Sequence, residues 1–197
     1  MKLVLASSNR GKLGELREVL GGSAIELHAQ SEFGVTDADE TGKTFIENAL
    51  IKARHAARAT GLPALGDDSG ICVDALNGAP GLYSARFSGP HGDAEANIDK
   101  LLSELEAVPD ERRGARFHCV LALLRHADDP EPIVVEGSWR GSILRARRGN
   151  GGHGYDPVFF DPLSGLSAAE MAPSQKNLVS HRGLALAALK RRLHELL

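Results

Sequence analysis

The sequence predicts an α/β fold around a mixed β-sheet, and three observations support this. Apolar runs of strand length alternate along the chain with segments of helical periodicity. The run at residues 116–125 is joined to the run at 133–138 by a turn at 128–130, which indicates a hairpin and therefore some antiparallel pairing. The chain has 197 residues, of which 42% are hydrophobic, and a chain of this size can bury about 70% of its unfolded surface. We therefore expect a single domain over residues 1–197.

The first elements are expected to be a strand, a helix and a second strand. Residues 2–6 form a short apolar run between polar residues, which is typical of a buried strand. Residues 7–9 supply turn and capping side chains, and residues 10–20 follow with helical spacing up to the Gly21-Gly22 pair. The residues expected to face inward from this helix are Leu13, Leu16, Val19 and Leu20. Residues 24–29 alternate weakly and predict the second strand.

The clearest helix is expected at residues 44–60, where alanine is frequent in the interior. Thr44 followed by Glu47 fits a capping box, and Gly61 and Pro63 end the element. The predicted buried stripe consists of Ile46, Leu50, Ala53 and Ala57.

The rest of the chain alternates in the same way. We expect strands at residues 62–66 and 116–125, and we expect the strand at 133–138 to continue through 139–145. Helices are expected at residues 94–105 and, as an amphipathic closing element, at 181–197. Residues 149–154 are too rich in glycine for regular structure.

Composition excludes several classes of protein. Cys72 and Cys119 lack the spacing of a zinc site or a disulfide framework. The first apolar run ends at Ser7, which is too short for a signal peptide, and no run reaches the about 18 residues of a membrane span, so a cytoplasmic location is expected. The net charge is −3, and the densest basic segment, residues 140–148, holds only four arginines. This favours a small anionic ligand over a long nucleic acid.

One polar cluster fits the binding of phosphate, and a second places a lysine on a helix face. The first, at the junction of the first strand and helix, consists of Ser7, Ser8, Asn9, Arg10, Gly11 and Lys12. It offers hydroxyls, helix N-terminal N–H groups and a lysine, although it is not a Walker A loop. A plain helix cap with a solvated lysine is the alternative. The second cluster is Glu40 followed by Asn48 and Lys52, and the four-residue spacing puts Asn48 and Lys52 on one helix face. By itself this pattern favours a rim lysine with its ammonium in water.

A third cluster, the acidic segment 67–70, follows the strand at 62–66. Adjacent carboxylates at a strand end repel each other, so Asp67 and Asp68 indicate a bound divalent cation or a carboxylate that acts as a base. An acidic turn is the alternative, because Asp, Ser and Gly are common in turns.

The fourth cluster lies near the C-terminus and fits a flat ligand with polar edges. Its residues are His153, Gly154, Tyr155, Asp156, Lys176, His181 and Arg182. Glycines let a ligand approach the backbone, the rings can stack, and the cations can donate hydrogen bonds, as a nucleobase requires. The alternative is a loose loop followed by a helix capped by Ser180.

With these clusters in view, the chain resembles the inosine triphosphate pyrophosphatase family, the bacterial non-canonical purine nucleotide pyrophosphatases. The resemblance rests on six segments in order along nearly the whole chain: LASSNRGKLGEL, ETGKTFIENALIKARHAA, DDSGICVDALNGAPGLYSARFSG, ARFHCVLALLRH, GHGYDPVF and SHRG. It implies a long mixed sheet flanked by helices, two lobes with an active-site cleft between them, and usually a homodimer. It also implies hydrolysis of ITP, dITP and XTP to the monophosphate and pyrophosphate.

The resemblance also implies roles for individual residues. The loop from Ser7 to Lys12 would bind the triphosphate, with Lys52 as a second phosphate contact. Glu40 and Asp68 would hold Mg²⁺, which Mn²⁺ could replace, and Asp68 would also be the general base. Residues implied to contact the rest of the substrate are Ser69, His153, Gly154, Tyr155, Asp156, Lys176, His181 and Arg182. Many relatives carry Phe where this chain has His153, which changes base stacking but not the class of reaction.

Two other functions remain open at this point. A pyrophosphatase similar to the septum-inhibition (Maf-type) family would share the first strand and its loop, but not GHGYDP or SHRG. A non-catalytic nucleotide- or RNA-binding module could use the same glycine loop and basic residues. The acidic net charge and the carboxylates at residues 67 and 68 disfavour RNA.

Overall fold

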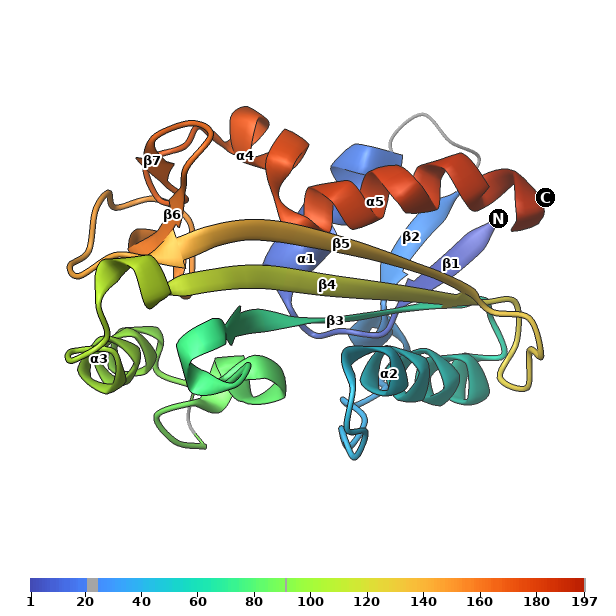
Figure 1. Ribbon diagram of the computed structural model, residues 1–197. Helices are drawn as coiled ribbons and strands as arrows, with labels where there is room; N and C mark the ends of the chain where they lie inside the picture. The colour runs from blue at the N-terminus through green and yellow to red at the C-terminus, as the bar shows by residue number, and fades with distance from the viewer. Residues whose placement is uncertain (21–24, 91, 197) are drawn as a thin grey trace. The chain divides into compact units, whose positions relative to one another are not determined.

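The computed structural model describes residues 1–20, 25–90 and 92–196 (Figure 1). The chain divides into two compact units. Unit 1 contains residues 1–68, 119–137 and 184–197, and unit 2 contains residues 69–118 and 138–183. Within the described ranges, each helix is too short or too polar to cross a lipid bilayer.

The strands confirm the predicted mixed sheet. Among the described residues they form one sheet of seven strands in the order β2-β1-β3-β4-β5-β6-β7. Their bounds are Lys2–Leu5 (β1), Glu26–Ala29 (β2), Ala64–Val73 (β3), Gly114–Leu124 (β4), Ile133–Ile143 (β5), Phe159–Asp161 (β6) and Leu166–Ser167 (β7). β1 runs parallel to β2 and β3, whereas β6 pairs antiparallel with both β5 and β7.

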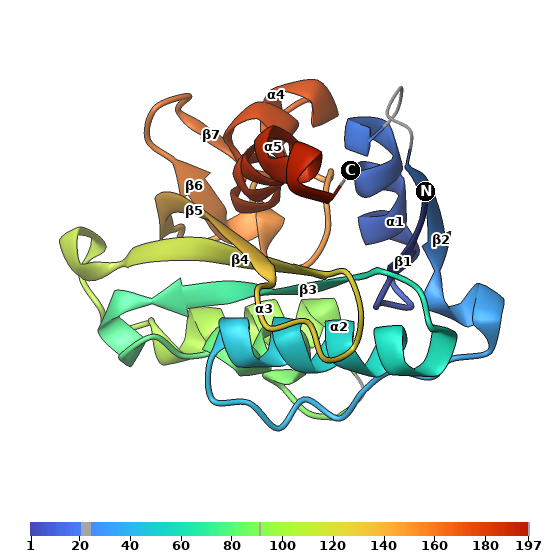
Figure 2. The same ribbon diagram turned by 90° about the vertical axis from the view of Figure 1, so that its right-hand side faces the viewer.

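In unit 1, helices cover both faces of the sheet. α1 (Arg10–Leu20) and α5 (His181–Arg192, of which unit 1 takes the part from Leu184) lie on one face, and α2 (Phe45–Thr60) lies on the other (Figures 1 and 2). The alternation of side chains along the strands explains this arrangement. Leu3 and Leu5 pack in the core formed with α1 and α5, whereas Val4 packs against the alanines of α2.

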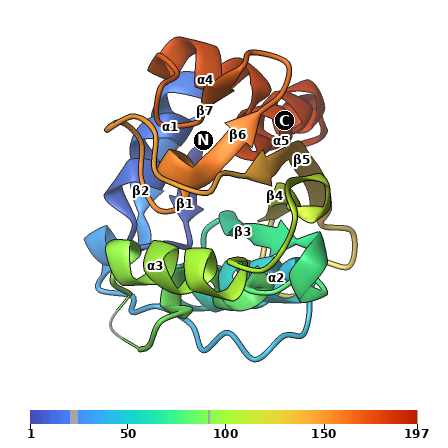
Figure 3. The same cartoon turned by 60° about the vertical axis from the view of Figure 1, so that its left-hand side comes forward.

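Unit 2 has a core of its own. The helix α3 (Ala94–Glu104) lies on one side of the strands, and α4 (Pro173–Val179) lies on the other (Figure 3). Ile98 and Leu101 of α3 pack with Phe117, Trp139 and residues of β6. Each unit therefore buries its own apolar surface.

The hairpin predicted between β4 and β5 is confirmed, since these strands are neighbours joined by residues 125–132. Asp129 is 2% exposed and organises the turn. Its carboxylate accepts hydrogen bonds from the backbone N–H groups of Arg125 and Glu131 and from the Arg125 guanidinium. The Arg125 guanidinium is the largest reason why the pKa of Asp129 lies far below its ordinary value.

Several predicted boundaries are confirmed. α1 begins at Arg10 and ends at Leu20, and α3 differs from its prediction by one residue. α2 has Thr44 as its cap, which accepts a hydrogen bond from the backbone of Glu47, and it ends at Gly61. The Glu47 carboxylate accepts a hydrogen bond from the backbone N–H of Lys43, the residue just before the cap, whereas a capping box uses the N–H of the cap residue itself.

Other predicted features lie outside the described residues or are wrong. Gly21, Gly22, Ala24, Leu197 and the side chain of Val19 are outside them. Ile46 was expected to be buried but is 39% exposed, because α2 turns the face with Asn48, Ala49, Lys52, Ala53 and Ala56 inward. The last helix ends at Arg192 and continues as a 3-10 turn, and the short elements β6, β7 and α4 were not predicted.

The acidic segment 67–70 lies inside a strand and not after one. It was expected at a strand end, but β3 continues through it to Val73. Successive side chains of a strand point to opposite faces, so Asp67 follows Leu65 toward the α1 face and Asp68 follows Gly66 toward the α2 face. The adjacent carboxylates therefore do not form a pair.

Gly66 fixes how closely α2 approaches β3. A Cβ atom at this position would overlap the backbone carbonyl oxygen of Ala49 in α2. Only glycine allows the two backbones to come so close, and this close approach brings the α2 side chains to the strand.

We predict opposite effects on stability for two Gly→Ala changes in unit 1. Gly66→Ala should lower the free energy of unfolding by about 2–3 kcal/mol, because α2 must move away from β3. Gly14→Ala, which meets nothing within 4 Å in α1, should raise it by up to about 1 kcal/mol. Urea denaturation measures both, and equal effects would contradict this account of Gly66.

Candidate functional site

The polar clusters of unit 1 meet at the carboxyl ends of β1 and β2. After β1 the chain turns into α1 on one face of the sheet, and after β2 it turns toward α2 on the other. Such a divergence is the point of an open α/β sheet at which ligands usually bind. β3 is paired with β1 through Val4 and Leu5, and its acidic segment continues beyond the end of β1.

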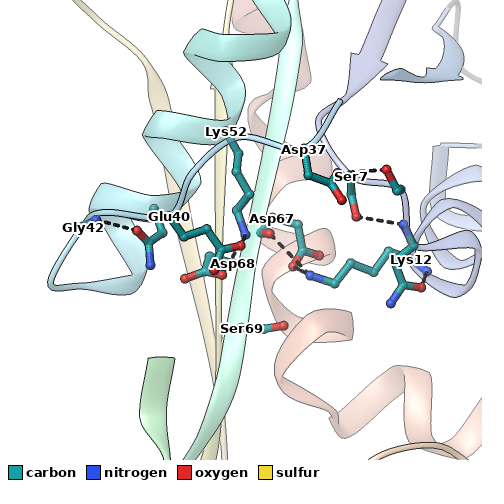
Figure 4. A network of polar contacts seen from close by, with 12 residues as sticks. Ser7, Lys12, Asp37, Glu40, Gly42, Lys52, Asp67, Asp68 and Ser69 are labelled. Carbon is teal, nitrogen blue, oxygen red and sulfur yellow. Dashed lines mark hydrogen bonds and ion pairs between the residues drawn. The ribbon is translucent and has the colours of Figure 1, made fainter. Parts of the chain in front are cut away.

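Lys12, in the first turn of α1, reaches β3 on the α1 face. Its Nζ lies 2.7 Å from Oδ1 of Asp67 and 3.4 Å from the Asp67 carbonyl oxygen (Figure 4). Asp67 is 0% exposed, whereas the Lys12 side chain keeps 17% of its surface exposed. The buried carboxylate is thus paired, and the ammonium remains accessible.

Lys52, in α2, reaches β3 from the opposite face and contacts two carboxylates. Its Nζ donates to Oδ1 of Asp68 at 2.7 Å and to Oε1 of Glu40 at 2.9 Å (Figure 4). Because one nitrogen contacts both oxygens, Glu40 and Asp68 lie close together although 28 residues separate them. The notion that Lys52 is merely a rim residue is wrong, because its side chain is only 11% exposed.

Burial and neighbouring charges shift the pKa values of Lys52 and Asp68. Burial alone would lower the pKa of Lys52, but the charges and hydrogen bonds of Asp68 and Glu40 outweigh it, so its pKa lies above the ordinary value. Burial raises the pKa of Asp68, although Lys52 acts in the opposite direction. A carboxylate with a raised pKa is a better proton acceptor, as a general base requires.

The loop after β1 is held by hydrogen bonds of its own side chains. Oδ1 of Asn9 accepts from the backbone N–H groups of Gly11 and Lys12, and Oγ of Ser7 accepts from the backbone of Asn9. The Ser8 hydroxyl donates to Asp37 at 2.8 Å. The predicted helix cap is therefore confirmed as Asn9, and the Arg10 side chain lies outside the described residues.

Two residues that the sequence did not single out fix the loop that leads to Glu40. Asp37 accepts hydrogen bonds from Ser8 and from the amide of Gln30, which is 1% exposed. On the other side of Glu40, the backbone N–H of Gly42 donates to Oδ1 of Asn48 at 2.9 Å. The loops that follow β1 and β2 are therefore joined. No periodicity marks Gln30 or Asp37, so only the fold could identify them.

The residues predicted to bind a base lie in unit 2. Asp156 is 3% exposed and its Oδ2 accepts hydrogen bonds from the Lys176 ammonium and, at 2.7 Å, from the backbone N–H of His153. Gly152 has a φ of 73° and no room for a Cβ beside the Asp156 carboxylate. Asp156 thus fixes the conformation of the glycine loop, which is not a loose connection. The side chain of His153 in this loop is exposed.

The remaining residues of this group have partners inside unit 2. Arg182 is 6% exposed and donates to Oγ of Ser69 at 2.9 Å. The His181 ring is stacked on Phe117, with centroids 4.8 Å apart and an interplanar angle of 12°. Tyr155 is 5% exposed and its hydroxyl donates to the carbonyl of Ser84, so little of its ring is available to a ligand.

The carboxylates of unit 1 fit a hard divalent cation. Oδ2 of Asp68 is buried and has no hydrogen-bond partner among the residues that the structure describes. No group of three or more His, Cys, Asp or Glu side chains in the described part of the chain is placed to hold a metal ion. Mg²⁺ is usually held by one or two carboxylates with substrate phosphates and water completing its ligands, and Glu40 with Asp68 provides such a donor set.

Known proteins are similar to this chain in sequence and in fold. The Ham1 family model matches residues 3–192. A dITP/XTP pyrophosphatase from Xanthomonas campestris is 60% identical over 98% of both chains, and one from Salmonella paratyphi A is 57% identical over 95% of both. The solved structure of a HAM1 protein from Coxiella burnetii is 50% identical, covers 99% of both chains and superposes with a TM-score of 0.94.

We predict that removing Lys52 makes stability depend on Mg²⁺. Lys52→Met leaves Glu40 and Asp68 without their shared cation, so the free energy of unfolding should fall by about 2–4 kcal/mol. Millimolar Mg²⁺ should restore part of this loss, because it binds only the folded arrangement. Thermal unfolding with and without Mg²⁺ measures the effect.

The matched control is the double variant Lys52→Met with Asp68→Asn, which keeps only one of the two carboxylates. It should gain much less from Mg²⁺. An equal gain in both variants would show that the ion binds elsewhere.

Proposed function

Because this chain belongs to the Ham1 family, we propose that it hydrolyses non-canonical purine nucleoside triphosphates, among them ITP, dITP and XTP. The products are the nucleoside monophosphate and pyrophosphate. The relatives named dITP/XTP pyrophosphatase support the substrate class. The observation that carries the chemistry is the pair of lysines held by carboxylates on the two faces of β3. Hydrolysis of damaged nucleotides would keep deaminated bases out of DNA and RNA.

In this proposal, Glu40 and Asp68 would hold a Mg²⁺ ion. Mn²⁺ could replace it, because hard oxygen ligands suit both ions. When bound with the substrate, the ion supplies positive charge that stabilises the pyrophosphate leaving group. The buried Oδ2 of Asp68, which lacks a hydrogen-bond partner among the described residues, supports this assignment.

Asp68 is also the general base in this proposal. It orients the water that attacks the α-phosphorus and accepts its proton. Lys12 and Lys52 donate hydrogen bonds to phosphate oxygens and stabilise the charge that develops on them. The loop from Ser7 to Gly11, whose conformation is fixed by the Asn9 cap, binds the phosphates further from the base, and the Ser7 hydroxyl is its donor in this proposal.

Arg182 selects the base in this proposal. A guanidinium only donates hydrogen bonds, so it suits the 6-keto oxygen of hypoxanthine or xanthine and not the 6-amino group of adenine. Its hydrogen bond to Ser69 supports a fixed orientation. Lys176 and Asp156 line the base site, and the exposed His153 can stack on the base.

The remaining expectations belong to the same proposal. The chain works as one domain over residues 1–197, as a homodimer and in the cytoplasm, where nucleotide pools are used. The continuous strands β3, β4 and β5, each of which has residues in both units, support one domain. A Maf-type activity on pyrimidine nucleotides is not favoured, because the Ham1 model covers residues 3–192.

We predict that pyrophosphate is released from ITP with Mg²⁺ and that none is released with EDTA. Asp68→Asn should lower turnover at least about a hundredfold, within the usual range for a positioned base, and should keep the fold. Pyrophosphate release from ITP, dITP, dTTP and UTP measures both points. Near-normal turnover by Asp68→Asn would remove this residue from the mechanism, and preferential cleavage of dTTP or UTP would favour the Maf-type reaction.

We predict that Arg182→Ala loses discrimination between bases more than it loses general activity. The ratio of kcat/KM for ITP to that for ATP should fall by at least about tenfold, because the donor that distinguishes the 6-position is gone. The two kcat/KM values measure this ratio directly. An unchanged ratio would show that Arg182 does not read the base.

A further inference from the structure

No step of the proposed reaction uses Asp67 directly, yet Asp67 is among the most buried charged residues that the structure describes. Its carboxylate is 0% exposed and lies 2.7 Å from the ammonium of Lys12. Burying a carboxylate is costly unless it is paired. Lys12 alone could be solvated in the first turn of α1, so the burial of its partner calls for an explanation.

The geometry separates Asp67 from the proposed metal site. Asp67 points to the α1 face of β3, whereas Asp68 points to the α2 face, where Lys52 and Glu40 lie. Figure 4 shows Asp67 directed toward Lys12 and the Asp68 group directed toward Lys52. A cation held by Glu40 and Asp68 therefore has Asp67 on the other side of the strand.

Lys12 is fixed at two points by a single residue. Its Nζ approaches Oδ1 of Asp67 at 2.7 Å and the Asp67 carbonyl oxygen at 3.4 Å. An ammonium has three donors, so one remains for a ligand. Without such a clamp, a lysine side chain retains most of its rotamer freedom, and ordering it on a substrate costs up to about 2 kcal/mol.

We propose that Asp67 is a positioning residue that acts through Lys12: it holds the ammonium at the end of β1 with one donor directed to a substrate phosphate oxygen. Asp67 contacts neither the substrate nor the metal ion. This inference rests on the proposed function for the identity of the substrate. The clamp itself follows from the contacts within unit 1.

A double-mutant cycle tests the inference, because a residue that acts only through Lys12 has no effect once Lys12 is gone. Asp67→Asn in the otherwise unchanged chain should lower kcat/KM for ITP about 10- to 100-fold, the usual result of misplacing one group. In the Lys12→Ala background, Asp67→Asn should change kcat/KM by less than about twofold. If Asp67→Asn does not fold, Asp67→Ser takes its place in the cycle.

The Mg²⁺ dependence of activity distinguishes a residue that positions Lys12 from a residue that binds the ion. The Mg²⁺ concentration for half-maximal activity should be the same in Asp67→Asn as in the unchanged chain, whereas Glu40→Gln should raise it. The structural control is Asp129→Asn, another buried carboxylate of unit 1 that is paired with an arginine. It should lower the melting temperature and leave kcat/KM unchanged.

Binding of inorganic tripolyphosphate, measured by calorimetry with Mg²⁺, separates this inference from the proposed function. Asp67→Asn should weaken binding severalfold only when Lys12 is present, even if ITP proves not to be a substrate. The inference is overturned by an equal loss in both backgrounds, by wild-type kcat/KM in Asp67→Asn, or by a changed Mg²⁺ requirement. Absence of pyrophosphate release from ITP by the unchanged chain, with the tripolyphosphate cycle intact, would overturn only the proposed function.

Discussion

The pairing of buried charges along one strand is the constraint on which the candidate site depends. Asp67 and Asp68 are consecutive residues of β3, so their side chains must point to opposite faces of the sheet. Each is largely buried and needs a cation. The cations come from Lys12 of α1 and Lys52 of α2, which cover those two faces. The strand therefore fixes two lysines at the end of β1, and Gly66 lets α2 come close enough to contribute its own.

The residues proposed to bind phosphate and those proposed to bind the base belong to different units of the chain. Unit 1 holds the lysines, the carboxylates and the loop after β1, and each of these suits phosphate or a hard cation. Unit 2 holds the glycine loop, Lys176 and Arg182, which suit a base. Asp68 and Ser69 are consecutive residues of β3. Asp68 belongs to the first group, and Ser69 accepts the hydrogen bond of Arg182, which belongs to the second. One strand thus carries a residue of each group.

The sequence predicted the fold class and the long helices, because their periodicity and caps are local properties. It could not predict that β3 continues through residues 67–70, since the four residues have the composition of a turn and only the lysines from two distant helices make an extended strand favourable. The predicted buried stripe of α2 wrongly included Ile46. This error also comes from contacts distant in sequence, because α2 turns Lys52 inward toward two carboxylates. Glu40 and Asp68 were predicted as a pair only from the resemblance to a known family. The roles of Asp37 and Gln30 depend on contacts that no local sequence pattern records. The same holds for the contact of Asp67 with Lys12.

In the proposed reaction, water attacks the phosphorus next to the sugar, so that the bond to the pyrophosphate group breaks. Hydrolysis of ITP in ¹⁸O-labelled water, followed by ³¹P NMR of the products, tests this most directly. If water attacks this phosphorus, the label enters the nucleoside monophosphate and the pyrophosphate stays unlabelled. Label in the pyrophosphate, or release of orthophosphate as the first product, would contradict it.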